Sequence, residues 1–455
     1  MSLKRVLVAN RGEIAVRIVR ACHALGIEAV VAVSDADRDS LAARMADRAV
    51  CIGPARSALS YLNVPALITA ARGTGCDAVH PGYGFLSERA VFAQACADND
   101  LVFIGPDPRA IQKMGNKLEA RALARECGVP LAEGSRDIRS VEDAARIAAD
   151  VGYPVLLKAA AGGGGRGIRV VRGAADLRGA YEGASAEALA AFGDGTLYVE
   201  RYIEDARHIE IQVLGDNAGK VLHLGERDCS PQRRYQKMIE AAPAADLSEA
   251  LRSQMQNAAV TLAKNIGYRN AGTVEFVVDQ QRQECYFLEM NTRIQVEHPV
   301  TEVVTGIDIV SWQIRIAGGE TLSLEQESIQ PKGYALECRI NAESPQHGFR
   351  PSPGRLTAWN APTGAGIRLD THCYAGYMVP PFYDSLLAKL IVHGEDRAAA
   401  IARTRNALAG FEVRGVDTTI SFLSYVLRQD EFLDAPVNTR WLEPCAQRFA
   451  DQHAA

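Results

Sequence analysis

The chain has 455 residues, of which 47% are hydrophobic and 23% are charged, and its net charge is −5. This length predicts two to four domains of an ordinary globular protein, and the slightly acidic balance argues against nucleic acid as a partner. The sequence lacks an apolar run of the roughly 18 residues that a membrane span needs, a secretory signal at its start, and a C-x-x-C pair among its ten cysteines, so we expect a cytoplasmic protein without a membrane partner or a zinc module.

The first hundred residues alternate short apolar runs with helical segments. The runs RVLVAN, EAVVAVS, DAVHPGYG and LVFIGP read as strands, and a helix is expected from about Glu13 to Leu25. This alternation predicts a parallel sheet with right-handed crossovers. The first strand-to-helix turn, from Asn10 to Glu13, lacks the G-x-G-x-x-G pattern of dinucleotide sites. We therefore expect a Rossmann-like layer that does not bind a dinucleotide.

Two segments that follow are candidates for ligand binding. HPGYGFLSE places Tyr83 beside one proline and two glycines, and such a turn is either structural or functional. Further on, MGNKLEARALARECGVP predicts a helix with Lys117 in its first turn and an end at Gly128. A lysine opposes the helix dipole at that position unless it binds an anion. Lys117 is therefore a candidate for binding a phosphate.

A run of glycines separates two strand-like segments in YPVLLKAAAGGGGRGIRVV. Lys158 stands near the end of the first segment, and four consecutive glycines follow, namely Gly162, Gly163, Gly164 and Gly165. Glycine lets backbone N–H groups approach phosphates, and its freedom permits a lid that opens. The spacing is not that of a Walker P-loop. The run predicts a phosphate-covering lid, with a flexible linker as the alternative.

Two further strands carry polar side chains. TLYVERYIED predicts a strand that ends at Glu200, Arg201, Tyr202 and Ile203, a position at which it can meet a nucleotide between two lobes. RHIEIQVLGD alternates, which places His208, Glu210 and Gln212 on one face. That polar face either meets solvent or lines a cleft.

A basic loop follows in ERDCSPQRRYQK. It groups four anion-binding or hydrogen-bonding side chains around Tyr235, and these are Gln232, Arg233, Arg234 and Lys237. Like charges repel unless an anion joins them, so the loop predicts a bound anion. Cys229 in the same segment reads as a spectator thiol.

The most informative stretch is the hairpin AGTVEFVVD to CYFLEMN. Glu289 and Asn291 stand two residues apart on one face of the second strand, and Glu275 lies on the first strand. If the strands pair, three oxygen ligands converge, and oxygen ligands suit Mg²⁺ beside substrate phosphates. Arg293, an anion binder, and Glu297, a possible base, follow at once, with Gln295 between them. The alternative is a charged strand exit with surface ion pairs.

The remaining chain is predicted to change from strands to helices and then back to short strands. EVVTGIDIVSWQIRIAGG reads as helical, Gly318-Gly319 marks a boundary, and short strands resume from about Gly333. Arg339 lies inside the apolar strand YALECRINAE, and an arginine in that position needs an anionic partner. That partner is either a bound substrate or a structural carboxylate.

These motifs together resemble the biotin carboxylase family of the ATP-grasp superfamily. The resemblance rests on NRGEIAVRI, HPGYGFLSE, MGNK, GGGGRG, RHIEIQV, ERDCSPQRRYQK, EMNTRIQVEHPVTE and ECRINAE, which occur in this order from Met1 to about Cys445. It implies an α/β chain with an N-terminal Rossmann-like domain at 1–114, an ATP-grasp domain at 115–320 with a mobile lid subdomain at about 131–203, and a C-terminal α+β domain at 333–446. The extent of the match suggests a stand-alone subunit.

The resemblance also implies an activity and its partners. Such a subunit is an ATP-dependent ligase that carboxylates biotin on a biotin carboxyl carrier protein, through carboxyphosphate formed from ATP and bicarbonate. It serves the first half-reaction of a carboxylase such as acetyl-CoA carboxylase, hence fatty acid biosynthesis, or of another acyl-CoA, pyruvate or urea-type carboxylase. Carboxyltransferase subunits would be further partners, and a homodimer is expected.

Particular residues take roles from the same resemblance. The nucleotide would be held by Lys117, Lys158, Glu200, Arg201, Ile203, His208, Gln232 and Tyr235, under the lid of Gly162 to Gly167. Magnesium or manganese would be held by Glu275, Glu289 and Asn291. Bicarbonate would be held by Lys237, Arg293, Gln295 and Val296, with Glu297 as general base, and Arg339 and Tyr83 would face biotin.

Four positions depart from the family pattern and favour a paralogue that serves a carboxylase other than the acetyl-CoA enzyme, and two alternatives to a biotin carboxylase also stay open. The departures are Ala161, Tyr235, Ala241 and Thr439. One alternative is another ATP-grasp ligase that joins a carboxylate to an amine. The other is a nucleotide-binding regulatory subunit without catalysis, which Tyr235 and Thr439 motivate.

Overall fold

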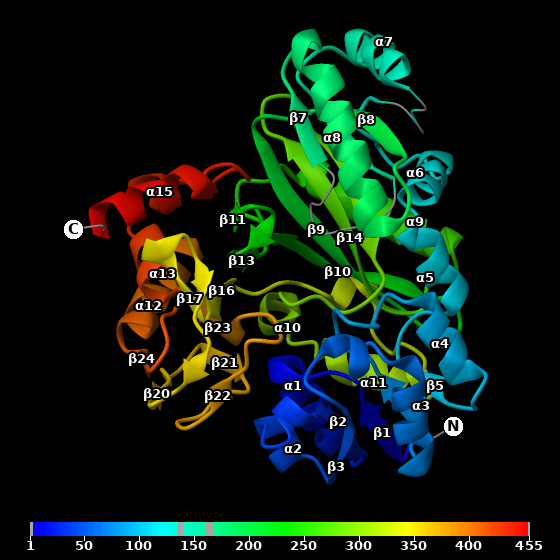
Figure 1. Cartoon of the computed structure of the whole chain (residues 1–455), viewed down its shortest axis with the longest axis vertical. Helices are drawn as coiled ribbons and strands as arrows, with labels where there is room; N and C mark the ends of the chain where they lie inside the picture. Colours follow the sequence, from blue (N-terminus) through cyan, green and yellow to red (C-terminus); the bar gives the residue numbers. More distant parts are fainter. Residues whose placement is uncertain (1–2, 135–137, 139, 161–167, 454–455) are drawn as a thin grey trace.

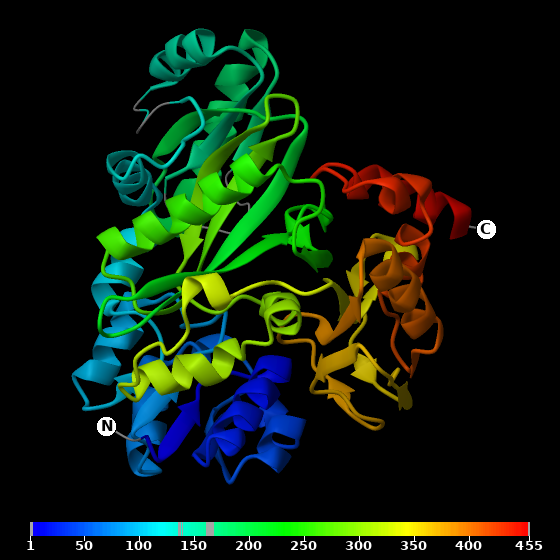
Figure 2. The same ribbon diagram turned by 180° about the vertical axis from the view of Figure 1, so that it is seen from behind.

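The protein combines a parallel sheet, a small three-stranded sheet and a long antiparallel sheet that reaches into the C-terminal region (Figure 1). The structure is a computed structural model, and it describes residues 3–134, 138, 140–160 and 168–453. Figure 2 shows the same arrangement from behind, with both chain termini at the edges of the molecule. Within these residues, no helix combines the length and the apolar character needed to cross a bilayer.

The N-terminal sheet has the strand order β3-β2-β1-β4-β5, and neighbouring strands are parallel. Its strands are β1 (Arg5–Val8), β2 (Glu28–Ser34), β3 (Arg48–Gly53), β4 (Ala78–His80) and β5 (Val102–Phe103), and its helices are α1 (Gly12–Ala24), α2 (Leu41–Met45), α3 (Val64–Gly73) and α4 (Ala90–Ala97). The prediction of a parallel sheet with helical crossovers is confirmed.

A small unit follows, at the top of Figure 1. Its sheet has the order β7-β6-β8, from β6 (Val155–Ala159), β7 (Ile168–Val171) and β8 (Leu197–Arg201). The helices α7 (Val141–Val151) and α8 (Ala174–Phe192) pack on it, and Ala144, Leu157, Val171 and Leu177 belong to one apolar core. The helices α5 (Pro108–Gly115) and α6 (Lys117–Glu126) lead into this unit from the N-terminal sheet.

The long sheet has eight strands in the order β15-β14-β9-β10-β13-β16-β23-β21, paired antiparallel. The strands are β9 (Ala206–Gly215), β10 (Val221–Asp228), β13 (Ile239–Ala242), β14 (Asn270–Asp279), β15 (Glu284–Asn291), β16 (Tyr334–Asn341), β21 (Ile367–Thr371) and β23 (Leu386–Gly394). The hairpin of β11 (Gln232–Arg233) and β12 (Gln236–Lys237) joins β10 to β13. The helix α9 (Glu249–Asn265) crosses the back of the sheet (Figure 2).

The remaining elements close the fold around this sheet. The helices α10 (His298–Thr305) and α11 (Ile309–Ala317) follow β15, and a C-terminal group of helices packs against β16 and β23, comprising α12 (Arg397–Ala409), α13 (Ile420–Val426), α14 (Asp430–Asp434) and α15 (Leu442–His453). The remaining short strands form two-stranded pairs, and they are β17 (Glu343–Ser344), β18 (Arg350–Pro351), β19 (Gly354–Arg355), β20 (Ala358–Asn360), β22 (Met378–Val379) and β24 (Glu412–Arg414).

Strand β9 explains how the sheet positions polar groups. Ile209, Ile211 and Val213 point to one face and share an apolar core with Met255 and Leu262 of α9. The opposite face carries His208, Glu210 and Gln212, and these side chains are buried as well. This polar face is therefore shielded from solvent inside the protein, which excludes the alternative that it meets solvent.

Local capping fixes two of the predicted turns. Asn116 accepts hydrogen bonds from the backbone N–H groups of Leu118 and Glu119, which starts α6 at Lys117. Asp279 accepts from the N–H groups of Gln281 and Arg282, which closes the β14–β15 hairpin. The helix start at Lys117 and the hairpin are therefore where the sequence predicts them.

Candidate active site

A row of charged side chains crosses four neighbouring strands of the long sheet. Glu289 of β15 pairs with Glu275 of β14, Glu275 pairs with Glu210 of β9, and Glu210 pairs with Arg227 of β10. Residues opposite each other on paired strands project to the same face. The prediction that Glu275 and Glu289 come together is confirmed, and Glu210 extends the acidic row.

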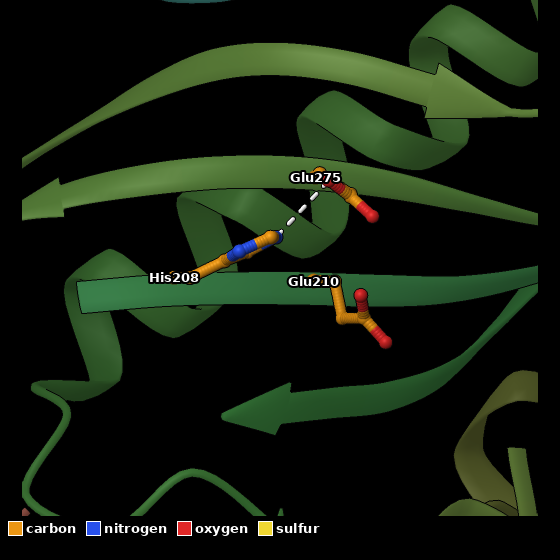
Figure 3. A group of neighbouring side chains, drawn as sticks. All are labelled: His208, Glu210 and Glu275. Atoms are coloured by element: carbon orange, nitrogen blue, oxygen red, sulfur yellow. Dashed lines mark ion pairs between the residues drawn. The ribbon is translucent and has the colours of Figure 1, made fainter. Parts of the chain in front are cut away.

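Figure 3 shows how Glu275 and Glu210 lie beside His208. His208 Nε2 lies 3.1 Å from Glu275 Oε2. The ligand atoms of these three side chains lie within 4.8 Å of one another, as do those of Glu210, Cys229 and Glu297. The site thus concentrates carboxylates in a buried place, which requires cations nearby.

Two cationic side chains, one on β10 and one on β12, pair with these carboxylates. The fully buried Arg227 places Nε 2.5 Å from Glu210 Oε1, and its Nη1 donates to Gln212 and Thr301. Lys237 places Nζ 2.5 Å from Glu297 Oε1, 2.6 Å from Glu210 Oε2 and 3.2 Å from Glu275 Oε1. All three protons of the Lys237 ammonium therefore have a carboxylate partner.

Glu297 is held from two sides, because Arg339 Nη2 lies 2.9 Å from its second oxygen, Oε2. Burial alone raises the pKa of Glu297, but the charges of Lys237, Arg339 and Arg227 outweigh burial and hold it well below its usual range. The pKa of Glu275 is lowered for the same kind of reason. Burial raises it, but Lys237 and His208 lower it by more. Both carboxylates are ionised at neutral pH.

Arg339 also reaches a second buried acid. Its guanidinium lies 2.5 Å from Glu240 Oε1, and Glu240 pairs across strands with Glu337, which is also fully buried. Burial raises the pKa of Glu240 to about 7, although Arg339 opposes the shift, and burial raises the pKa of Glu337 well above its usual range. Two facing carboxylates in a dry place favour a bound proton. The partner that the sequence demanded for Arg339 is thus a pair of carboxylates, Glu240 and Glu297.

The raised pKa of Glu240 predicts a pH-dependent stability. A carboxyl whose folded pKa exceeds the ordinary value near 4.5 contributes stability below that value, and it loses the contribution as pH rises through about 7. Relative to the wild type, Glu240→Gln should therefore gain about 2 kcal/mol of unfolding free energy between pH 5 and pH 8. Denaturant unfolding at both pH values measures this gain, and an equal difference at both would contradict the assignment.

The loop after β15 brings Arg293 to the same place. Arg293 Nη1 donates to Gln295 Oε1 at 2.6 Å, and its Nη2 donates to Asn291 Oδ1 at 3.2 Å. Both amides in turn donate to Glu275 Oε1, at 3.1 Å from Gln295 and 2.8 Å from Asn291. Arg293 and Lys237 therefore meet on one network around Glu275, as predicted. Glu88 fixes the loop, since it accepts from Arg293 Nε and from the Thr292 N–H.

The donor set suits a divalent cation at Glu275, Glu289 and Asn291. Glu289 keeps 32% of its side chain exposed, and its Oε2 lies 3.5 Å from Lys117 Nζ. Oxygen atoms of two facing carboxylates and one amide, with one side open to a ligand, are the coordination that Mg²⁺ takes beside phosphates. The ammonium groups of Lys117 and Lys237 lie beside the same carboxylates, and they offset part of the negative charge of this set.

The predicted nucleotide residues lie on both sides of this row. Lys158 and Arg121 each form a close ion pair with one oxygen of the buried Glu200, and Lys117 stands at the start of α6. Burial raises the pKa of Glu200, but Lys158 and Arg121 lower it by more. Glu200 thus holds Lys158, and both oxygens of its carboxylate are engaged.

The other predicted nucleotide residues are spread more widely. Arg201 donates to Asp279 and Tyr286 of the β14–β15 hairpin, and Ile203 is buried. Gln232 pairs with Lys237 in the β11–β12 hairpin, whereas Tyr235 at its tip is 58% exposed with a φ of 65°. The lid glycines, Gly162 to Gly167, and Ala161 lie outside the described residues.

Tyr83 borders a cavity of about 150 Å³ near the N-terminal end of α1. Its hydroxyl donates to Glu13 in a short hydrogen bond, and Glu13, Arg11 and Asp384 line the same cavity. The turn that carries Tyr83 therefore borders a hollow, which favours its functional reading over the purely structural one.

Sequence reasoning passed over several charged residues of the site. Arg227 stands in the quoted segment ERDCSPQRR, and Glu240 follows the basic loop by three residues. Lys389 is the one charged residue inside the apolar strand LLAKLIVHG, as Arg339 is a charged residue inside YALECRINAE. The pattern that identified Arg339 as a candidate therefore also applies to Lys389.

Comparison with known proteins places these residues in a family context. Residues 2–111 match the family model of the biotin carboxylase N-terminal domain, residues 116–325 match the ATP-binding domain of the carbamoyl-phosphate synthase L chain, and residues 337–444 match the biotin carboxylase C-terminal domain. Together these matches cover most of the chain, and the match at 116–325 contains the acidic row.

Curated proteins resemble the chain over nearly its whole length. It is 52% identical to biotin carboxylase 1 of Bacillus subtilis, over 97% of this chain and 98% of that protein. It is 49% identical to the 2-oxoglutarate carboxylase small subunit of Hydrogenobacter thermophilus, over 97% of this chain and 93% of that protein.

Solved structures agree in fold. The biotin carboxylase–β,γ-ATP complex of Campylobacter jejuni superposes with a TM-score of 0.94 at 48% identity, over 97% of this chain and 98% of that one. The biotin carboxylase domain dimer of the Hydrogenobacter thermophilus 2-oxoglutarate carboxylase, in complex with MgADP, ADP and bicarbonate, superposes with a TM-score of 0.93 at 49% identity, over 97% of each chain.

Proposed function

The chain belongs to the biotin carboxylase family, with an ATP-grasp fold, and from this premise we propose how its residues share the reaction. The family makes the chain an ATP-dependent ligase that carboxylates biotin. Our proposal assigns the steps. Bicarbonate attacks the γ-phosphoryl group of ATP, ADP leaves, carboxyphosphate breaks down to carbon dioxide and phosphate, and the ureido nitrogen of biotin captures the carbon dioxide.

We assign the binding of ATP to the cations around Glu200 and Glu289. Lys158 and Lys117 hold the phosphates, His208 lies beside them, and Glu200, Arg201, Ile203, Gln232 and Tyr235 belong to the nucleotide side. Two anions approach each other in this reaction, so positive side chains must offset both charges. The two ion pairs of Glu200 support this role, because they hold the Glu200 carboxylate and with it the Lys158 side chain in place.

Glu275, Glu289 and Asn291 would hold Mg²⁺ or Mn²⁺. When bound, the ion would neutralise charge on the phosphate oxygens and help align the phosphoryl group for transfer. The protein contributes the facing carboxylates and the Asn291 amide, whose Nδ2 already donates to Glu275.

The observation that carries the proposal is Glu297 held between Lys237 and Arg339. Glu297 accepts the proton of bicarbonate, while Arg293, Gln295, Val296 and Lys237 bind the anion. A low pKa makes Glu297 a weak base, but anionic substrates compete for Lys237 and Arg339. Once those cations turn to the substrates, the pKa of Glu297 rises, and the carboxylate becomes a base when it is needed.

On the other side of Glu297, Arg339 and Tyr83 face biotin. The ureido nitrogen gives its proton to the phosphate released from carboxyphosphate, and the guanidinium of Arg339 stabilises the negative charge that this leaves on the ureido group. Glu240 holds that guanidinium in position. The cavity beside Tyr83 supports an approach of biotin from the side of α1.

The direct test is a turnover assay with the purified protein. We expect ADP release that needs bicarbonate, Mg²⁺ and free biotin together, and that stops when a chelator removes the metal. Release of ADP that an amine acceptor drives, and that ignores biotin, would favour the alternative ATP-grasp ligase instead. Absence of turnover with every acceptor would instead favour a regulatory subunit.

We further propose the assembly in which the reaction occurs. The carrier of biotin is a biotin carboxyl carrier protein, a carboxyltransferase subunit consumes the product, and the chain acts in the cytoplasm as a homodimer of subunits with three domains, at 1–114, 115–320 and 333–446. Acetyl-CoA carboxylase, and so fatty acid biosynthesis, is the proposed setting. Co-purification from the native cell, with identification of the biotinylated partner, tests this setting against carboxylases of pyruvate, urea or other acyl-CoA acceptors.

A further inference from the structure

A fully buried lysine lies against the loop that carries Glu297. Lys389 of β23 donates from Nζ to the carbonyl oxygen of Val296 at 2.9 Å, and the same Nζ lies 3.0 Å from Glu13 Oε1. Asp370 Oδ2 is next, at 4.0 Å. An ammonium group without solvent contact is stable only when such partners surround it. The position of this charge is therefore closely specified.

The preceding carbonyl of the same loop is held in a similar way. His298 Nδ1 lies 2.7 Å from the carbonyl oxygen of Gln295. Burial, together with the charges of Lys389 and Arg17, lowers the pKa of His298 well below its usual range, so the ring is neutral and Nδ1–H donates to that carbonyl. Two buried side chains thus fix two successive peptide groups just before Glu297.

Fixing these peptide groups orients the base. The peptide bond between Val296 and Glu297 is planar, so a fixed carbonyl of Val296 also fixes the N–H and the Cα of Glu297. Lys389 also lies opposite Arg339 on the paired strands β23 and β16. One strand pair therefore holds Glu297 twice, through Arg339 at the carboxylate and through Lys389 at the backbone.

The other partner of Lys389 belongs to the biotin side. Glu13 stands in the first turn of α1, accepts the Tyr83 hydroxyl, and lines the cavity that Tyr83 borders. Lys389 therefore links three distant parts of the chain, namely the start of α1, the loop before α10, and β23. Its contacts set the distance between the cavity wall and the base.

We propose that Lys389 is a positioning residue of the reaction. It touches neither substrate, and it holds the peptide of Val296 and Glu297 so that the Glu297 carboxylate stays within hydrogen-bond reach of bicarbonate. A general base works at about 2.6–3.2 Å from the proton it takes, and a misplacement of about 1 Å costs on the order of 100-fold in rate. The inference rests on the proposed role of Glu297 as base.

The test is Lys389→Met, assayed for kcat, for the KM of bicarbonate, and for the Kd of ATP. We expect kcat to fall about 100-fold while the Kd of ATP stays within about twofold, because the nucleotide residues lie on other strands. Lys220→Met is the matched control, since Lys220 also holds a carboxylate, Glu325 at 2.8 Å, and a backbone carbonyl, Leu322 at 3.4 Å, far from the site. Its turnover should equal that of the wild type.

Two outcomes separate this inference from the proposed function. Wild-type turnover together with an unchanged kcat in folded Lys389→Met, or an equal loss of turnover and ATP binding, would refute the positioning role alone. A wild type that releases no ADP with biotin would refute the proposed function first.

Should Lys389→Met fail to fold, His298→Asn and His298→Leu replace it. Asparagine keeps a donor for the Gln295 carbonyl and should retain most turnover, whereas leucine should lose it, and equal rates in both would overturn the proposal.

Discussion

Glu297→Gln should lose biotin-dependent turnover by about 10²–10⁴-fold and still bind ATP. Glutamine keeps the shape of the side chain, and its carbonyl oxygen can still accept a hydrogen bond from Lys237 or Arg339. It cannot take a proton from bicarbonate, which is the step assigned to this residue. Steady-state ADP release measures the loss, and calorimetric titration with ATP measures the binding that should remain.

The control for this variant is Glu302→Gln. Glu302 is a buried glutamate five residues further along, and it holds Arg17 and Arg368 at 3.0 and 2.8 Å. The same substitution there should lower stability and leave turnover per folded molecule near that of the wild type. Full turnover in Glu297→Gln would remove Glu297 from the role of base, whereas an equal loss in both variants would point to a structural cause.

Much of the site follows from sequence because it lies on local patterns. Strand alternation places His208 and Glu210 on one face, and a two-residue spacing does the same for Glu289 and Asn291. A short polar turn between two apolar runs predicts that Glu275 and Glu289 meet. In each case the residues concerned are neighbours in sequence or in one hairpin, so a periodicity of two suffices to place them.

The contacts that sequence could not supply join distant segments. Arg339 meets Glu240 because β13 and β16 pair, although 99 residues separate them, and Lys389 meets Glu13 across an even longer interval. Periodicity shows that a charge lies inside a strand, but it does not say which opposite charge pairs with it. The polar face of β9 illustrates the same limit, since alternation defined the face and only the tertiary packing decided that it is buried.

Lys237→Met is expected to destabilise the protein more at high pH than at low pH. The variant leaves Glu210, Glu275 and Glu297 buried without their shared ammonium, and removal of one partner from a buried ion cluster costs about 3–5 kcal/mol. In the wild type the pKa values of Glu275 and Glu297 are lowered, so their stabilising contribution is present above the ordinary pKa and is lost as pH falls. Without Lys237, only Arg339 and Arg227 oppose the effect of burial at Glu297, and only His208 opposes it at Glu275, so both pKa values rise and the ionised carboxylates cost more stability as pH rises.

The difference in unfolding free energy between the wild type and Lys237→Met should therefore grow from pH 5 to pH 8, and turnover should be lost at both. Denaturant unfolding across this range measures the trend, with Lys220→Met as the matched loss of a lysine whose partner Glu325 is 72% exposed. A surface pair of that kind contributes about 0–1 kcal/mol, so the control should show a small difference that does not change with pH. A constant difference for Lys237→Met would mean that Glu275 and Glu297 do not depend on Lys237 for their charge, and the assignment of Lys237 as the centre of this cluster would fall.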